Sequence, residues 1–240
     1  MYKIYNDDNE KILDQLYWTE HVEFDLIYAD CIYNNKKFDD WIFKSFEVLS
    51  YGGIFMIQTD YHTVAEIKIF LDELGLHFIN WAIYLQEWGG TSNRFFSRKH
   101  DDILIYAKGP DYKFYPERVQ IPKATANTAF DKKGTGKKTP CDVFYDLGNF
   151  STMSKERVKL NGKNIQWQKP LKLMNRLLLP FTDKGDVILD PFMGSGTTGV
   201  WSMQNRRVFF GIEKDKEVFN IAKERIQKEY DLHLLQEKSI

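Results

Sequence analysis

A chain of 240 residues that is 43% hydrophobic is long enough for one α/β domain with a sizeable core. Its two cysteines do not make a disulfide framework, and no apolar run approaches the ~20 residues that span a membrane. Residues 1–87 hold 6 Lys/Arg against 16 Asp/Glu, whereas residues 108–138 hold 8 against 3. The net charge of −1 therefore conceals a basic middle that would attract a polyanion, unless it is only a solvated loop.

Residues 1–23 predict a short leader and a helix, without evident chemistry or a signal-peptide pattern. The two cysteines without a disulfide framework favour a reducing cytoplasm. From residue 24 to residue 107, short β-rich apolar runs alternate with stretches of helical apolar spacing. Such alternation predicts an α/β protein with a doubly wound, mostly parallel sheet. The predicted elements are strands at 24–29, 54–57, 78–85 and 102–107 and helices at 39–50 and 63–74.

The pattern breaks between residues 109 and 166, which we call the middle region. Four prolines fall there, glycines lie among its lysines, and the apolar periodicity is poor. We therefore expect an insert or a mobile loop. Regular patterns return afterwards, with helices predicted at 171–178 and 216–227 and strands at 187–189 and 207–212.

A glycine-containing turn joins the strand predicted at 187–189 to a helix that can start near Thr198. Gly194 and Gly196 let the backbone turn tightly and approach a ligand without Cβ clashes. The helix N-terminus then offers free N–H groups and positive dipole character to a carboxylate or phosphate. We call this segment the glycine turn; its residues are Asp190, Pro191, Phe192, Met193, Gly194, Ser195, Gly196, Thr197 and Thr198.

The strand predicted at 207–212 ends at Glu213, which lies 17 residues beyond Gly196. This is close to the spacing at which an acidic residue meets the ribose hydroxyls in doubly wound nucleotide sites. An ordinary strand–turn–helix is the alternative explanation of the glycines alone. Together with Glu213, however, the glycine turn predicts a site for an adenosine cofactor.

The glycine turn, followed by Gly211-Ile212-Glu213, resembles the S-adenosylmethionine site of amino-group DNA methyltransferases. The segment Gln168-Lys169-Pro170-Leu171 is similar to the one that precedes this site in the same family. A catalytic motif early in the chain and the cofactor motif late correspond to the permuted, or beta, order of the family. The resemblance covers nearly the whole chain, with a loose match over the middle region.

This resemblance implies a Rossmann-like class I S-adenosylmethionine methyltransferase fold with an inserted DNA-recognition region. It divides the chain into a catalytic half at 1–108, a target-recognition insert at 109–166 and a cofactor-binding half at 167–240. S-adenosyl-L-methionine is the implied cofactor. The residues implied to bind it are those of the glycine turn together with Glu213, Lys169 and Asp30.

The resemblance also makes Asp30-Cys31-Ile32-Tyr33 the catalytic motif, where the family has Asp-Pro-Pro-Tyr. An exocyclic amine is a poor nucleophile because its lone pair is delocalised into the ring. The Asp30 carboxylate would accept a hydrogen bond from one N–H of this amine, and the Cys31 carbonyl would accept one from the other. Together they would favour a pyramidal nitrogen. Tyr33 would stack on a base flipped out of the duplex. Both prolines are absent, so Cys31 and Ile32 must obtain from packing the shape that prolines would fix.

Cys31 has a second interpretation, as the thiol nucleophile of a cytosine-C5 methyltransferase. Those enzymes place a proline before the cysteine and the cofactor motif first, and neither holds here. We therefore treat Cys31 as a small buried residue. The five histidines show no ligand spacing with cysteines or carboxylates, so no metal is expected.

Two basic segments are candidates for contact with DNA. The segment 93–99 mixes cations with aromatic residues, which suits phosphate contact and base stacking, although a surface loop is an alternative. The lysines of the middle region flank glycines and suit nonspecific backbone contact. The candidate DNA-binding residues are Arg94, Arg98, Lys99, Lys132, Lys133, Lys137 and Lys138.

The sequence thus predicts a methyltransferase that acts on an exocyclic amine of double-stranded DNA, as in restriction–modification systems. Asp at position 30 favours adenine N6 over cytosine N4, because Ser is common there in the cytosine enzymes. A relative that binds DNA and cofactor but has lost catalysis is the rival hypothesis. Methylation of RNA or protein by the same fold also stays open. The family further implies a homodimer as one arrangement, and no membrane association.

Overall fold

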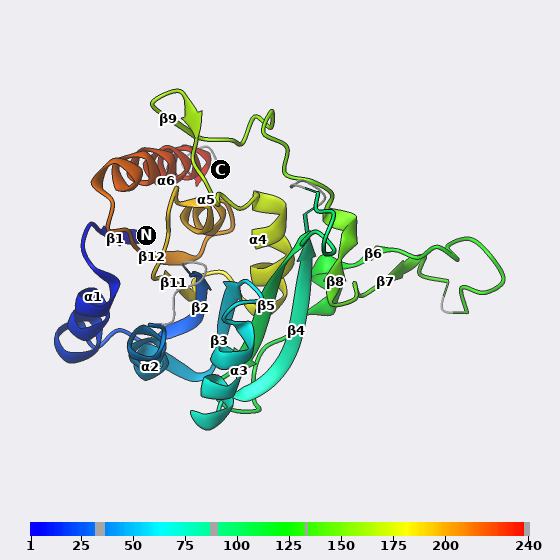
Figure 1. The fold of residues 1–240 in the computed structure, drawn as a ribbon, viewed down its shortest axis with the longest axis horizontal. Coiled ribbons are helices and arrows are strands. Elements are labelled where there is room, and N and C mark those ends of the chain that lie inside the picture. The colour runs from blue at the N-terminus through cyan, green and yellow to red at the C-terminus, as the bar shows by residue number, and fades with distance from the viewer. Residues whose placement is uncertain (32–36, 87–90, 133, 238–240) are drawn as a thin grey trace.

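The computed structural model describes residues 1–31, 37–86, 91–132 and 134–237. Within these ranges, an eight-stranded sheet forms the centre of the molecule (Figure 1). Its strands, in spatial order, are β1 (Tyr2–Tyr5), β12 (Val208–Ile212), β11 (Val187–Asp190), β2 (Phe24–Asp30), β3 (Leu49–Thr59), β5 (His100–Ala107), β4 (His77–Leu85) and β8 (Val143–Phe144).

The sheet is mostly parallel, as the alternation of strand and helix patterns predicts. Every neighbouring pair from β1 to β3 runs parallel, and β8 is parallel to β4. Only β5 reverses, pairing antiparallel with both β3 and β4. Apolar strand patterns carry no direction, so the sequence could not reveal this reversal.

Helices cover both faces of the sheet (Figure 1). Successive strand residues point to opposite faces, so Leu26 and Tyr28 join one core cluster while Ile27 and Ala29 join the other. The first cluster includes residues of α4 (Leu171–Leu178), α5 (Thr197–Gln204) and α6 (Lys216–Glu237). The second includes residues of α1 (Asn9–Gln15), α2 (Asp39–Val48) and α3 (Val64–Glu73).

Several predicted bounds differ from the structure. The N-terminal leader is the edge strand β1, which pairs with β12. The helix predicted at 39–50 ends at Val48, and β3 begins at Leu49. Gly52 and Gly53 lie within β3, where the Gly52 N–H donates to the Lys108 carbonyl and the Gly53 carbonyl accepts the Lys108 N–H. The last helix continues ten residues past its predicted end at 227, to Glu237.

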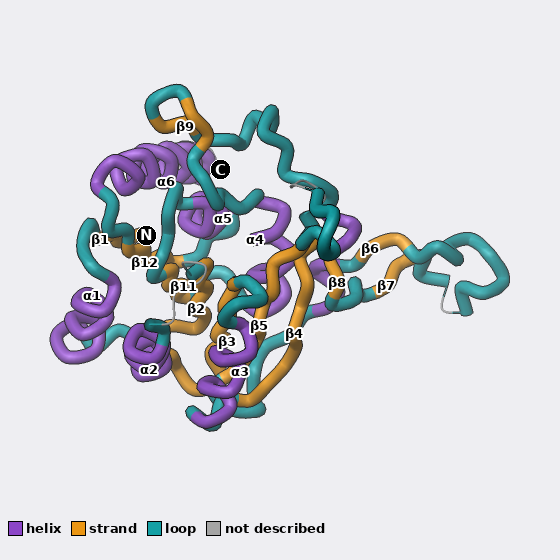
Figure 2. Tube along the Cα trace, viewed as in Figure 1, coloured by secondary structure: helices purple, strands orange, loops and turns teal. Residues whose placement is uncertain are grey.

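The middle region is joined to the rest of the fold through the central sheet. Its strand β8 joins the central sheet, and it holds two small hairpins, as the tube in Figure 2 shows. One hairpin, β9 (Lys159–Leu160) with β10 (Lys163–Asn164), lies near α6; the other, β6 (Ile121–Pro122) with β7 (Lys137–Lys138), belongs to a projection that we call the arm, residues 121–138. The remaining short helical turns are η1 (Leu16–Glu20), η2 (Pro116–Val119), η3 (Tyr145–Leu147) and η4 (Leu179–Phe181).

Candidate active site and cofactor pocket

The candidate site lies where the sheet changes its winding direction. The strands β11 and β2 are parallel neighbours, yet the chain continues from β11 to β12 on one side and from β2 to β3 on the other. Ligands of open α/β sheets bind in the crevice outside the carboxyl ends of such strands. Asp190 and Asp30 are the last residues of these two strands, so two distant parts of the sequence meet at this crevice.

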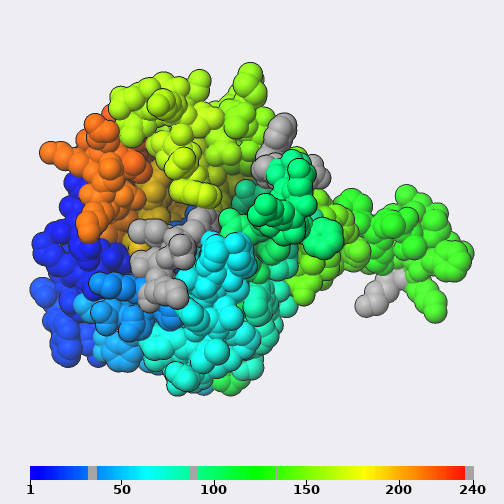
Figure 3. Space-filling model, viewed as in Figure 1, coloured from blue at the N-terminus to red at the C-terminus, as the bar shows by residue number. Residues whose placement is uncertain are grey.

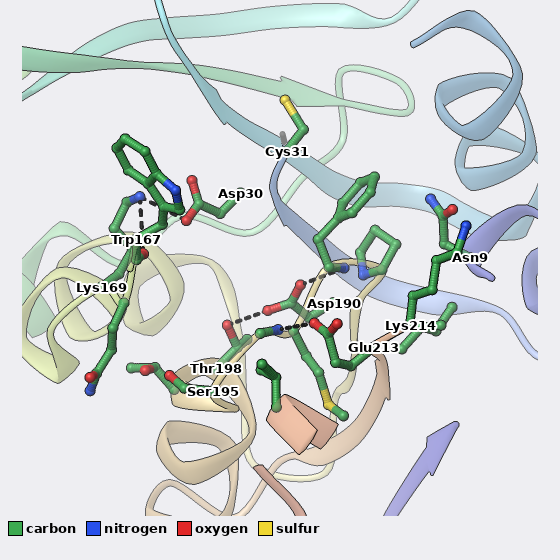
Figure 4. Close-up of a pocket in the computed structure, with 18 of the residues that line it drawn as sticks. Asn9, Asp30, Cys31, Trp167, Lys169, Asp190, Ser195, Thr198, Glu213 and Lys214 are labelled. Atoms are coloured by element: carbon green, nitrogen blue, oxygen red, sulfur yellow. Dashed lines mark hydrogen bonds and ion pairs between the residues drawn. The ribbon is translucent and has the colours of Figure 1, made fainter. Parts of the chain in front are cut away.

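A cavity of about 1100 Å³ opens at this edge of the sheet. Figure 3 shows the surface hollowed between the blue N-terminal segment and the orange and yellow C-terminal half. Figure 4 shows Asp30 and Trp167 on one side of the cavity, Asn9 and Lys214 on the other, and Asp190 and Glu213 between them. Among the described residues that the sequence assigned to catalysis or to the cofactor, all except Gly196 line the cavity.

Asp190 organises the glycine turn from inside. Its carboxylate accepts hydrogen bonds from the Phe192 N–H at 3.0 Å and from the Thr198 hydroxyl at 2.6 Å. Burial raises the pKa of the Asp190 carboxyl to about 7, and these two hydrogen bonds partly oppose that shift. The side chain therefore holds the turn against the first turn of α5 and exposes little of itself to the cavity.

The two glycines of the turn have different surroundings. Gly194 has a φ of +51° and borders the cavity, and an added Cβ would meet only the Phe192 carbonyl oxygen, at 3.8 Å. Gly196 has a φ of +80° and faces α6, where a Cβ would lie 3.0 Å from the Ala222 Cβ and 3.2 Å from the Ile226 Cδ1. A branched side chain at Gly196 would therefore press on α6, although the sequence assigned both glycines the same role of close approach to a ligand.

Glu213, at the end of β12, is tied to the glycine turn. Its carboxylate accepts the Gly194 N–H at 3.1 Å and the Asp215 N–H at 2.7 Å. Burial raises the pKa of the Glu213 carboxyl, and these backbone donors partly oppose the shift. Because Glu213 also borders the cavity, it can present an acceptor to ligand hydroxyls there.

The catalytic end of the cavity holds Asp30 in an ion pair. The Lys169 ammonium donates to Asp30 Oδ2 at 2.7 Å, and the Lys169 side chain is only 7% exposed. Lys169 thus contacts the candidate catalytic carboxylate, a position that the resemblance assigned only to cofactor binding. Ile32 and Tyr33 lie outside the described residues.

Cys31 is buried, and its surroundings do not favour a thiol nucleophile. Its N–H donates to the Gln58 carbonyl at 3.2 Å, and its Sγ points away from the other labelled side chains of Figure 4, towards the same carbonyl at 3.5 Å. Burial raises the pKa of the Cys31 thiol to about 12. A thiol held in its neutral form is a poor nucleophile, which argues against cytosine-C5 chemistry.

The cavity wall has the polar groups that an adenosine-type cofactor needs. The Asn9 amide nitrogen and the Thr197 hydroxyl are buried, border the cavity and have no hydrogen-bond partner within the described ranges. Buried polar atoms are rarely left unsatisfied, so both are suited to a bound ligand. With the open approach at Gly194 and the Glu213 carboxylate, the wall fits a cofactor that carries hydroxyl, amino and carboxylate groups.

Sequence reasoning missed one wall of the cavity. Residues 7–10 line it, although the N-terminal segment showed no chemistry in the sequence. Only the helix cap offered a signal, since the Asp8 carboxylate accepts the Glu10 N–H at the start of α1. Trp167 and Lys214 were also missed; Trp167 lines the cavity with a φ of +62°, which is uncommon for a bulky residue.

The candidate DNA-binding residues do not line this cavity. Arg98 pairs with Asp60 at 3.0 Å and lies over the Tyr61 ring, and Arg94 is exposed nearby in the sequence. Lys132, Lys137 and Lys138 are exposed on the arm. Lys99 is half-buried at the entrance to β5, and Lys133 lies outside the described residues.

Two further searches concern metal and membrane. Among the residues that the structure describes, no three His, Cys, Asp or Glu side chains gather in a way that could hold a metal ion. None of the described helices combines the length and the apolar character that crossing a bilayer requires.

The family model described as DNA methylase matches residues 24–224, and the chain therefore belongs to this family of amino-group DNA methyltransferases. The family expected from the glycine turn is thus confirmed. The chain is also similar to M1.HpyAVI, solved as a SAM complex, with a TM-score of 0.71 and 26% identity over 94% of this chain and 100% of that one. The class I methyltransferase fold is confirmed as well.

Curated relatives are type II methyltransferases. The chain is 29% identical to M.HpaI of Haemophilus parainfluenzae over 194 residues. This alignment covers 80% of this chain and 59% of M.HpaI. The chain is 32% identical to M2.DpnII of Streptococcus pneumoniae over 198 residues, an alignment that covers 81% of this chain and 67% of M2.DpnII. The chain spans 51% of M.BglII of Bacillus subtilis, so it matches little more than half of some relatives. The cytosine-N4-specific PvuII DNA methyltransferase, with a TM-score of 0.66 and 15% identity, shares the fold.

Proposed function

We propose that this protein transfers a methyl group from S-adenosylmethionine to the exocyclic amine of a base in double-stranded DNA. The observation that carries the proposal is the convergence of Asp30, the glycine turn and Glu213 on one cavity at the switch point of the sheet. The SAM complex of M1.HpyAVI and the type II relatives support the same reaction class. A bacterial cytoplasm is the compartment that we propose.

Held by the glycine turn and Glu213, S-adenosylmethionine would supply an electrophilic methyl group on a sulfonium sulfur; the C–S bond would break as the C–N bond forms, and the extra proton of the methylated amine would be released to solvent. The residues of the chain prepare the amine. The Asp30 carboxylate accepts a hydrogen bond from one amine N–H, and the Cys31 carbonyl accepts a hydrogen bond from the other. These two bonds localise the nitrogen lone pair and aim it at the methyl carbon. Tyr33 stacks on the base after it leaves the duplex.

Three groups of residues hold the cofactor in this proposal. Glu213 accepts from the ribose hydroxyls, as acidic residues at the end of the second strand do in doubly wound sites. Asn9 and Thr197 supply the buried polar atoms that lack a partner within the described chain. The remaining wall comes from the glycine turn, whose free N–H groups at the start of α5 suit a carboxylate.

Adenine N6 is our proposed target, and cytosine N4 is the alternative. Asp at position 30 favours adenine through the resemblance, whereas the shared fold of the cytosine-N4-specific PvuII enzyme shows that this architecture also serves cytosine. We assign DNA recognition to the middle region, residues 109–166, because the exposed lysines of the arm lie there. Neither the choice of target base nor the assignment of DNA recognition depends on a homodimer.

A relative that has lost catalysis is a second candidate. Both motif prolines are absent, and Asp30 is engaged by Lys169 in this structure. This candidate also binds cofactor and DNA, but it transfers no methyl group.

Labelled methyl transfer to mixed-sequence DNA, followed by nucleoside mass spectrometry, tests the proposal. We expect N6-methyladenine from the wild-type protein. Asp30→Ala should lower the single-turnover rate by at least ~100-fold, the usual scale for losing one positioned electrostatic group. Its cofactor affinity should stay within a few fold. No transfer by the wild type, but transfer after proline is restored at positions 31 and 32, would establish the catalytically lost relative instead.

A further inference from the structure

The ion pair between Lys169 and Asp30 is part of a longer buried network. Lys169 Nζ also lies 3.7 Å from Oδ2 of Asp101, in β5, and 3.4 Å from the Trp167 carbonyl oxygen. The side chains of Asp30, Lys169 and Asp101 are 15%, 7% and 8% exposed. One buried ammonium therefore lies between two carboxylates, and only one of these belongs to the motif that the sequence identified.

Two amide groups anchor Asp101 on its other side. Asp101 Oδ2 accepts from Gln58 Nε2 at 2.8 Å and from Gln86 Nε2 at 2.5 Å. Gln58 in turn accepts the Tyr28 hydroxyl at 2.7 Å. The network thus ties together β2, β3 and β5 and the residue that follows β4. Because these elements belong to one sheet, the position of Asp101 is fixed by the fold.

Lys169 contacts the two carboxylates, Asp30 and Asp101, at different distances. The 2.7 Å contact of Lys169 with Asp30 is a direct charge-assisted hydrogen bond, whereas the 3.7 Å separation from Asp101 is a looser electrostatic contact. Among the contacts of the described residues, Asp101 therefore reaches Asp30 through Lys169. Removing one member of a buried charge group leaves the others poorly compensated, so the loss of Asp101 should loosen Lys169.

We propose that Asp101 is a positioning residue, which holds Lys169 so that Lys169 sets the direction of the Asp30 carboxylate. This role rests on the proposed function, because it matters only if Asp30 orients the target amine. A carboxylate has about four lone-pair sites, so Asp30 can accept an amine hydrogen while it stays bonded to Lys169.

Asp101→Asn tests this role, since asparagine has the same shape without the charge. We expect the single-turnover methyl-transfer rate to fall about ten- to hundredfold, the rate equivalent of losing one interaction with a charged group. The KM values for cofactor and DNA should stay within about threefold, because Asp101 lies behind the site. A purely structural role would lower the folded fraction and leave the rate per active site unchanged.

The neighbouring Asp102 provides a matched control. It is also a buried aspartate of β5, but it accepts from Trp81 Nε1 at 2.8 Å and takes no part in the hydrogen bonds of the network. Asp102→Asn should lower the melting temperature and leave the transfer rate per folded molecule unchanged. An equal rate loss in Asp101→Asn and Asp102→Asn would overturn the positioning role.

A double-mutant cycle with Lys169→Met tests the route through Lys169. If Asp101 acts only through Lys169, adding Asp101→Asn to Lys169→Met should lower the rate by less than about twofold further. Additive losses would overturn the route. If Asp101→Asn does not fold, Gln86→Leu removes one anchor of the same carboxylate and should lower the rate in the same direction.

The proposed function and this inference fail in different ways. A wild-type protein that transfers methyl groups, beside an Asp101→Asn variant with an equal rate, overturns only the inference. A wild-type protein that transfers nothing to any DNA overturns the proposed function, and the positioning role falls with it.

Discussion

At the scale of single residues, Asp190 shows how a motif residue can serve the fold as much as the ligand. Its carboxyl group is buried between the Phe192 N–H and the Thr198 hydroxyl, and its pKa is raised to about 7. A fold that raises the pKa of an acid binds that proton more tightly than the unfolded chain does. The protonated form therefore stabilises the cofactor-free protein, and ionisation opposes folding.

The expected pH dependence follows from this sign. The contribution of Asp190 to the free energy of unfolding should be greatest below pH ~4, fall as the pH rises, and level off above the folded-state pKa of about 7. Asp190→Asn does not ionise; its amide oxygen can accept from the Phe192 N–H, and its amide nitrogen can donate to the Thr198 hydroxyl oxygen. Urea unfolding between pH 5 and pH 8 should therefore show a smaller loss of stability in the variant than in the wild type. Parallel curves would contradict a buried, titrating Asp190.

Glu213 should act mainly on cofactor affinity. Glu213→Ala removes the acceptor of the Gly194 N–H and the proposed partner of the ribose hydroxyls, so binding should weaken by ~1–3 kcal/mol. Glu213→Gln keeps an acceptor for Gly194 and should weaken binding less. Calorimetric titration with S-adenosylmethionine measures both variants. Unchanged affinity in a folded Glu213→Ala protein would remove Glu213 from the cofactor site.

At the scale of elements, the glycine turn and α6 form one packed unit. Gly196 lies against Ala222 and Ile226 of α6, and the Arg225 guanidinium donates to the Ser195 carbonyl. The turn is thus fixed by a helix that begins 18 residues beyond its last residue, Thr198. Gly194, in contrast, faces the cavity. The two glycines of one motif therefore have separable roles.

Alanine at each glycine should separate these roles. Gly196→Ala combines a positive φ with contacts of 3.0 to 3.2 Å, so it should destabilise the fold by about 1–3 kcal/mol. Gly194→Ala has a positive φ but open space, so it should be less destabilising and should weaken cofactor binding more. Urea unfolding and calorimetry on the same preparations compare them. The reverse order of stabilities would contradict the packing argument.

At the scale of the whole molecule, charge is distributed unevenly. The N-terminal third carries the acidic excess, whereas the arm, which carries exposed lysines, projects away from the sheet (Figure 1). The cavity and the arm are separate features. The middle region, which includes the arm, joins the central sheet through its strand β8. This arrangement suits an enzyme that holds a duplex on one part of its surface and reacts with one base at another.

Replacing Lys132, Lys133, Lys137 and Lys138 with alanine should weaken DNA binding on any sequence. The slope of log K against log salt should fall by roughly one unit for each lost phosphate contact, while cofactor affinity stays the same. Lys223→Ala with Lys228→Ala, two exposed lysines of α6, is a control for net charge. If all variants keep the wild-type slope, DNA contacts some other surface.

The sequence by itself determined the family, the alternation of strands and helices, and the glycine-turn side of the cavity. These features are local: a strand, a glycine turn and a helix are adjacent in sequence, and apolar periodicity reports burial directly. The spacing after the glycine turn pointed to Glu213, and the family resemblance pointed to Asp30. The sequence could not place the edge strand β1 or the direction of β5, because strand pairing is not encoded in the periodicity of one strand.

Only the tertiary structure decided which distant residues meet. Asp30, Asp101 and Lys169 lie far apart in the chain and share one buried network, because the end of β2 and the start of the antiparallel β5 lie at the same edge of the sheet and residue 169 returns to it. The N-terminal wall at residues 7–10 and the packing of Gly196 on α6 arise in the same way. A lysine, an aspartate or a glycine carries no local sign of its distant partner, since burial and charge pairing exist only once the chain has folded.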